Sequence, residues 1–126
     1  MIAGIEHIGI LAQDPAALAA WYVEALNFRE IFRTDDASAI FVHGTQSGMI
    51  EFVAYPAGQP LPGKDRRMHL AIVVDDFGAA LCQLQAAGVN FPEPPRDIFG
   101  HGKVQFFQDP EGNWLHLVYR PHTPWD

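Results

Sequence analysis

The fold is decided by the stretch Met68-His69-Leu70-Ala71-Ile72-Val73-Val74-Asp75, which repeats a pattern first seen at Ile5-Glu6-His7-Ile8-Gly9-Ile10. Each stretch is a short apolar run with one histidine, and each leads into a segment with the spacing of an amphipathic helix. The offset that aligns the two histidines nearly equals the offset that aligns Glu51 with His116, near the end of each half. The chain is therefore predicted to hold two copies of one β-α-β-β-β module.

The first copy begins with a predicted strand from Ile5 to Ala12. Asp14 then supplies an N-cap and Pro15 the first helical position, so that a helix is expected from there to near Asn27. Three apolar-rich runs separated by turn residues complete the copy as strands at 28–33, 38–43 and 49–55.

The second copy begins with a predicted strand at 68–74, and Asp75-Asp76 caps a helix that ends before Gly88. Three prolines within 91–98 make that run an edge strand or an irregular one, because proline cannot donate to a sheet ladder. Two further strands are expected at 104–107 and 114–119.

Composition limits the classes of partner. The 126 residues are 48% hydrophobic and 18% charged, which suits one domain with a real core and excludes a disordered chain. Fifteen acidic residues against eight basic ones give a net charge of -7 and favour neither nucleic acid nor an anionic membrane. The one cluster of basic residues, Lys64-Asp65-Arg66-Arg67, includes an acidic residue and is interpreted as a solvated loop.

Cysteine usage and the first residues indicate a compartment. The single Cys82 cannot form an internal disulfide, which fits a reducing environment. No apolar run is long enough to span a bilayer, and the start of the chain shows no secretory signal. We expect a soluble, cytoplasmic protein.

Four polar residues occupy matching places in apolar strands. His7 and His69 lie in the first strand of each copy, and Glu51 and His116 lie in the last. Because side chains alternate along a strand, leucines and isoleucines of opposite parity would cover the helix-facing side. The four polar side chains would then share the other face, where they can surround one ion.

Three imidazoles and a carboxylate suit a first-row divalent metal such as Zn, Ni, Co, Mn or Fe(II), and suit Mg or Ca poorly. One histidine on a strand is more often a hydrogen-bonded core residue than a ligand, but four residues at symmetry-related places favour a metal site. The other three histidines have no symmetric counterpart and are interpreted as surface or loop residues: His43, His101 and His122.

These motifs resemble the vicinal oxygen chelate superfamily, which includes glyoxalase I, extradiol dioxygenases and bleomycin-resistance proteins. The resemblance covers nearly the whole chain and includes the signature Phe107-Gln108-Asp109-Pro110-Glu111-Gly112-Asn113-Trp114-Leu115-His116-Leu117. It implies an α+β fold in which two paired βαβββ modules form a cup-shaped mixed β-sheet with flanking helices. The expected single domain covers residues 1–126, with module one at 4–55, a linker at 56–66 and module two at 67–120.

Carried over by position, the resemblance implies that His7, Glu51 and His69 are metal ligands of a glyoxalase I-like site. The fourth ligand in such enzymes is glutamate, and here it is His116, which would be a ligand or a neutral base. The expected function is a lyase or isomerase whose metal holds vicinal oxygens of a small carbonyl substrate and stabilises an enediolate, with Glu51 moving the proton. The alternatives are a small-molecule binding protein of the bleomycin-resistance type and a ring-cleaving dioxygenase. The resemblance also suggests a homodimer. The cup-shaped sheet that holds the metal could then be completed by residues of the second chain.

Overall fold

The structure is a computed structural model that describes residues 1–60 and 62–125. It divides into two compact units, Met1–Leu61 and Pro62–Asp126, and each contains one helix and one four-stranded sheet. No helix in the described part of the chain has the length and apolar character required to cross a bilayer.

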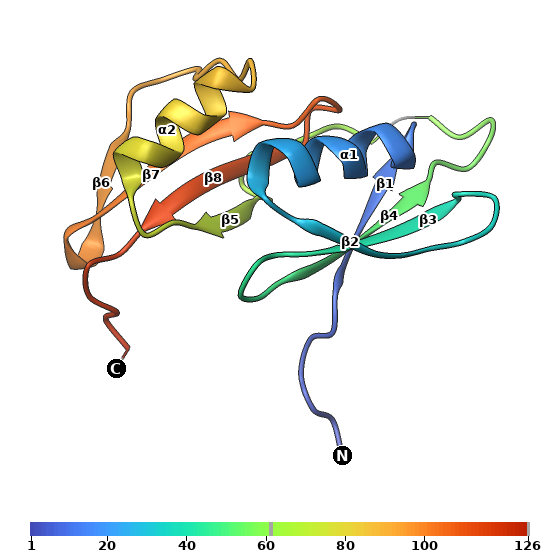
Figure 1. The fold of residues 1–126 in the computed structure, drawn as a ribbon, viewed down its shortest axis with the longest axis horizontal. Helices are drawn as coiled ribbons and strands as arrows, with labels where there is room; N and C mark the ends of the chain where they lie inside the picture. The colour runs from blue at the N-terminus through green and yellow to red at the C-terminus, as the bar shows by residue number, and fades with distance from the viewer. Residues whose placement is uncertain (61, 126) are drawn as a thin grey trace. The chain divides into compact units, whose positions relative to one another are not determined.

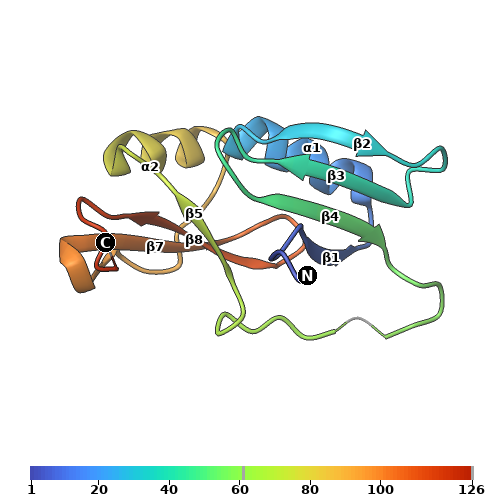
Figure 2. The same cartoon turned by 90° about the horizontal axis from the view of Figure 1, so that it is seen from below.

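The first unit consists of strand β1 (Ile8–Ala12), helix α1 (Pro15–Leu26) and strands β2 (Arg29–Arg33), β3 (Ala39–His43) and β4 (Met49–Ala54). Its sheet has the order β1-β4-β3-β2, in which β1 runs parallel to β4 and the other pairs are antiparallel. Helix α1 lies along one face of this sheet (Figure 1; Figure 2).

Local chemistry explains where α1 begins and ends. The Asp14 side chain accepts a hydrogen bond from the Ala17 N–H, which satisfies one of the free donors of the first turn, and Pro15 follows at the first position. Asn27 ends the helix in the left-handed conformation, with φ of 61°. Within the helix, Tyr22 is fully buried and its ring lies 4.8 Å from that of Phe52 in β4. This contact makes the Phe52 side of β4 the face that α1 covers.

The second unit repeats the order with strand β5 (Leu70–Val73), helix α2 (Phe77–Ala86) and strands β6 (Arg96–Ile98), β7 (Gly102–Gln108) and β8 (Trp114–Tyr119), and a short 3₁₀ turn, η1 (Phe99–His101), precedes β7. Its sheet has the order β5-β8-β7-β6, with β5 parallel to β8. Asp76 caps α2 through a hydrogen bond from the Ala79 N–H, as Asp14 caps α1.

The two faces of the second sheet bury different side chains. One face carries a cluster of Val104, Phe106 and Val118, packed against Ile98 and Trp114, and this cluster includes no residue of α2. Residues alternate along β8, so the inaccessible Leu115 and Leu117 point to the opposite face, which α2 covers with its buried Leu84. His116, between those two leucines, shares the face of the Val104 cluster.

The predicted α+β class and the duplicated β-α-β-β-β order are confirmed, and several strand boundaries differ from expectation. The first strands begin at Ile8 and Leu70, so His7 and His69 directly precede them instead of lying within them. Strand β7 begins at Gly102, because residues 102–104 pair with β6. The prolines at 92, 94 and 95 confine β6 to three residues at the edge of its sheet, as their missing N–H groups predict.

Candidate metal centre

The first unit brings together His7 and Glu51. Strand pairing places Gly9 opposite Glu51, and the His7 Nε2 atom lies 3.3 Å from the Glu51 Oε1 atom. Glu51 lies next to Phe52, whose side chain faces α1, so the Glu51 carboxylate lies on the face that α1 leaves free. Phe41 of β3 is paired with Glu51, and the His7 ring packs edge-on against the Phe41 ring at 5.3 Å.

The second unit brings together His69 and His116 in the same way. Strand pairing places Ala71 opposite His116, and the two imidazole rings lie 4.5 Å apart. Phe106 of β7 is paired with His116, and the His69 ring packs edge-on against the Phe106 ring at 5.4 Å. Each unit therefore holds two metal-type donors beside a phenylalanine, at equivalent positions of the repeat.

Hydrogen bonds made by the Nδ1 atoms determine which nitrogen of the His69 and His116 rings is free to bind a metal. The His69 Nδ1 atom lies 2.9 Å from the Arg66 carbonyl oxygen, and the His116 Nδ1 atom lies 3.1 Å from the Leu117 carbonyl oxygen. A carbonyl only accepts, so both Nδ1 atoms must donate, which leaves the Nε2 lone pairs available. Metal-binding histidines are commonly oriented by such bonds on their other nitrogen.

His7 has an equivalent arrangement with a carboxylate. Its Nδ1 atom lies 2.9 Å from the Glu6 Oε1 atom, so this nitrogen donates, and Nε2 then faces the Glu51 carboxylate. In the neutral ring two acceptors oppose each other there, and a proton or a cation between them relieves the repulsion. The residues present thus fit a divalent first-row ion by donor type and by tautomer.

Burial keeps His116 neutral. Its side chain is in the core of the second unit, and burial lowers the pKa of His116 below its usual range, with the neighbouring His69 lowering it further. A neutral imidazole is the form that binds a metal ion.

Each unit contributes two of the predicted ligands. Among residues 1–60 and 62–125, no three or more His, Cys, Asp or Glu side chains form a group that could hold a metal ion. Of the other histidines, the His43 Nδ1 atom contacts the Gly44 carbonyl oxygen at 2.6 Å, and His101 and His122 are exposed.

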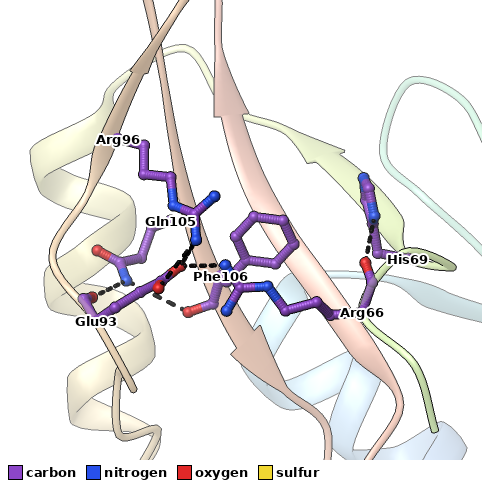
Figure 3. Close-up of polar contacts among 6 residues, drawn as sticks. All are labelled: Arg66, His69, Glu93, Arg96, Gln105 and Phe106. Atoms are coloured by element: carbon purple, nitrogen blue, oxygen red, sulfur yellow. Dashed lines mark hydrogen bonds and ion pairs between the residues drawn. The ribbon is translucent and has the colours of Figure 1, made fainter.

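Sequence reasoning missed the side chains around Phe106. Figure 3 shows Arg66 and Arg96 converging on Glu93, next to the Phe106 ring, with His69 close to Arg66. The interpretation of 64–67 as a solvated loop holds for Arg67, which pairs with exposed Asp65, and is wrong for Arg66, whose guanidinium lies 4.4 Å from the centre of the Phe106 ring. Prolines around Glu93 marked an irregular segment, but nothing in the sequence indicated that it meets Arg66.

The family model described as Glyoxalase/Bleomycin resistance protein/Dioxygenase superfamily matches residues 4–117. The chain is 30% identical over 122 residues to the uncharacterized protein YaeR of Escherichia coli, covering 90% of this chain and 93% of that protein.

Solved structures share the fold. A lactoylglutathione lyase from Agrobacterium tumefaciens superposes with a TM-score of 0.71 at 15% identity, over 94% of each chain. A FosX fosfomycin resistance protein from Listeria monocytogenes, in complex with Mn(II) and 1S,2S-dihydroxypropylphosphonic acid, superposes with a TM-score of 0.71 at 21% identity, over 93% of this chain and 90% of that one.

Proposed function

The chain belongs to the Glyoxalase/Bleomycin resistance protein/Dioxygenase superfamily, and we propose that it is a metal-dependent lyase or isomerase similar to glyoxalase I. Its substrate is a small molecule with a carbonyl and a second oxygen on the adjacent carbon. The observation that carries this proposal is the duplicated donor pair, His7 with Glu51 and His69 with His116, built alike in the two units.

The four residues together would hold one divalent first-row ion, with the three histidines binding through Nε2. The second unit holds the His69 and His116 rings side by side, and in the first unit His7 Nε2 faces the Glu51 carboxylate, which supports binding of an ion by both pairs. When bound, the metal would supply Lewis-acid polarisation of the substrate's vicinal oxygens.

Glu51 is the proposed base that moves a proton on and off the carbon next to the carbonyl. It is the carboxylate of the set, and its position in β4 next to Phe52 puts it on the face of the first sheet that α1 leaves free. A positioned acid–base group typically accelerates such a step by about 10²–10⁴-fold. His116, kept neutral by burial, serves as a ligand or as a second base.

Metal content separates this proposal from a protein that only binds a small apolar molecule. We expect purified protein, reconstituted with Zn, Ni, Co, Mn or Fe(II), to retain roughly one equivalent per chain by elemental analysis, as one four-ligand site requires. His69→Ala should lower metal affinity by orders of magnitude, and His43→Ala, which changes a histidine outside both pairs, should leave it nearly unchanged.

Two results would contradict the proposal. One is retention of less than about a tenth of an equivalent, without uptake on titration, since a four-ligand site should not release its ion so readily. The other is an equal effect of the two alanine variants. A methylglyoxal–glutathione assay of the reconstituted protein then tests the reaction class directly.

A further inference from the structure

The Phe106 ring carries a guanidinium on its face. The Arg66 Cζ atom lies 4.4 Å from the centre of this ring and 5.6 Å from the centre of the Trp114 ring, while the Arg96 Cζ atom lies 5.5 Å from the Phe106 centre. Stacking on an aromatic face stabilises a guanidinium that is partly shielded from solvent, and it restricts the motion of that group. Two cationic groups are thus held at one side of the second sheet.

Glu93 connects the two arginines. Its Oε1 atom lies 2.7 Å from Arg66 Nη2 and 2.8 Å from Arg96 Nη2, and the buried Gln105 fixes the segment by donating to the Glu93 carbonyl oxygen at 2.7 Å. One carboxylate between two guanidinium groups leaves a net charge of +1. Figure 3 shows these side chains gathered around Phe106.

The arginines keep donors for a further anion. Among the described residues, their hydrogen bonds use only the Nη2 atoms, although each guanidinium has five N–H groups. The Arg66 and Arg96 side chains are 31% and 52% exposed, so a ligand can reach them. Free donors on a preorganised, partly shielded guanidinium are the usual means of binding carboxylate or phosphonate groups.

The same cluster adjoins the proposed ligands. Both imidazoles contact the Phe106 ring that Arg66 covers, His116 at 5.0 Å and His69 at 5.4 Å, and the Arg66 carbonyl accepts the hydrogen bond of His69 Nδ1. In the first unit, the equivalent Phe41 contacts His7 and Phe32, and the described residues place no guanidinium over it. The cation pair therefore belongs to one half of the repeat.

We propose that the substrate carries an anionic group, a carboxylate or a phosphonate, that binds Arg66 and Arg96 beside the His69–His116 pair. This inference rests on the proposed function, because it assigns a substrate class to the same site. The anion would fix one orientation of the substrate, because the arginines lie at the Phe106 ring of the second unit and the described residues place none over Phe41 of the first.

The test uses NMR titration of the arginine side-chain N–H signals in the metal-free protein, so that binding to a metal does not contribute. The probes are acetate and methylphosphonate, with acetamide and dimethyl methylphosphonate as neutral counterparts. We expect at least one of the two anions to shift the Arg66 and Arg96 signals, with a shift that reaches a plateau as the anion concentration rises. The neutral probes should leave these signals unchanged. The stronger anion identifies the group.

Matched variants locate the site. Arg66→Met should weaken binding of the anion at least about tenfold, as expected for loss of a charge-assisted hydrogen bond. Arg67→Met, which removes a neighbouring charge that is 88% exposed, should change it less than about twofold. Arg96→Met gives the same test if Arg66→Met does not fold.

Equal losses in Arg66→Met and Arg67→Met, or equal binding of neutral and anionic probes, would overturn the inference. Elemental analysis of each folded variant is a separate readout. If the wild-type protein takes up metal but does not bind the anions, only the inference of an anionic substrate is rejected. If it binds the anions but takes up no metal, the proposed function is rejected.

Discussion

At the scale of single residues, the candidate centre is defined by the hydrogen bonds that the Nδ1 atoms of its imidazoles make. His69 and His116 both donate from Nδ1 to main-chain carbonyl oxygens, which selects the tautomer with a free Nε2 atom. Main-chain acceptors do not depend on a second side chain, so the backbone of the turn at Arg66 orients His69 and the backbone of β8 orients His116. His7 depends instead on Glu6, whose side chain is 77% exposed, and is the less firmly oriented ring.

The lowered pKa of His116 predicts how the stability of the metal-free protein depends on pH. Burial, followed by the effect of His69, makes protonation harder in the folded state than in the unfolded state. The contribution of neutral His116 is complete above the ordinary histidine pKa of about 6.5 and is lost as the pH falls below it. With EDTA present, urea unfolding between pH 7 and pH 5 should show a free energy of unfolding that falls less steeply in His116→Gln than in the wild type.

His101→Gln, a change at an exposed histidine, is the control for this experiment. It should follow the wild-type dependence. An unchanged slope in His116→Gln would show that His116 takes up its proton equally well in both states.

At the scale of elements, each helix is started by an aspartate cap and each sheet ends in a parallel edge strand. Strands β1 and β5 pair on one side with β4 and β8 and have no second neighbour in their sheets. Both edges nevertheless carry accessible apolar side chains, with Ile8 at 47% and Val73 at 67% exposure. Open apolar edges of this kind are usually covered, because they otherwise promote aggregation.

These edges predict that the protein is a homodimer, since a second copy can cover two edges at once by symmetry. Sedimentation velocity over a hundredfold range of protein concentration should give a mass of two chains. A single-chain mass at every concentration would contradict this prediction.

At the scale of the whole molecule, duplication distributes the proposed ligands evenly, two to each unit. Binding of a metal to the folded state alone raises stability with metal concentration. If both units supply ligands to one ion, neither pair by itself should reproduce this effect.

Thermal unfolding tests this expectation with one variant in each unit. The Tm of the wild-type protein should rise with added metal, and the rise should be abolished both by His7→Ala and by His69→Ala. His122→Ala, an exposed histidine outside both pairs, should retain it. A rise that survives in His7→Ala but not in His69→Ala would restrict the metal to the second unit.

The duplicated order of elements and the four candidate ligands could be predicted from the sequence because they depend on local patterns. Asp14 and Asp76 cap helices through neighbours three residues away, and alternation along β4 and β8 sets the faces of Glu51 and His116. The three-residue β6 likewise follows from prolines within its own segment.

Only the tertiary structure decided what surrounds those ligands. Arg66 meets Glu93 and the face of Phe106 across long intervals of chain, and a charged residue in a polar segment shows no local sign of such a partner. The same holds for the start of β1 at Ile8 and of β5 at Leu70, which depends on pairing with distant β4 and β8. Local patterns are written in adjacent residues, whereas stacking and register depend on which distant segments the fold brings together.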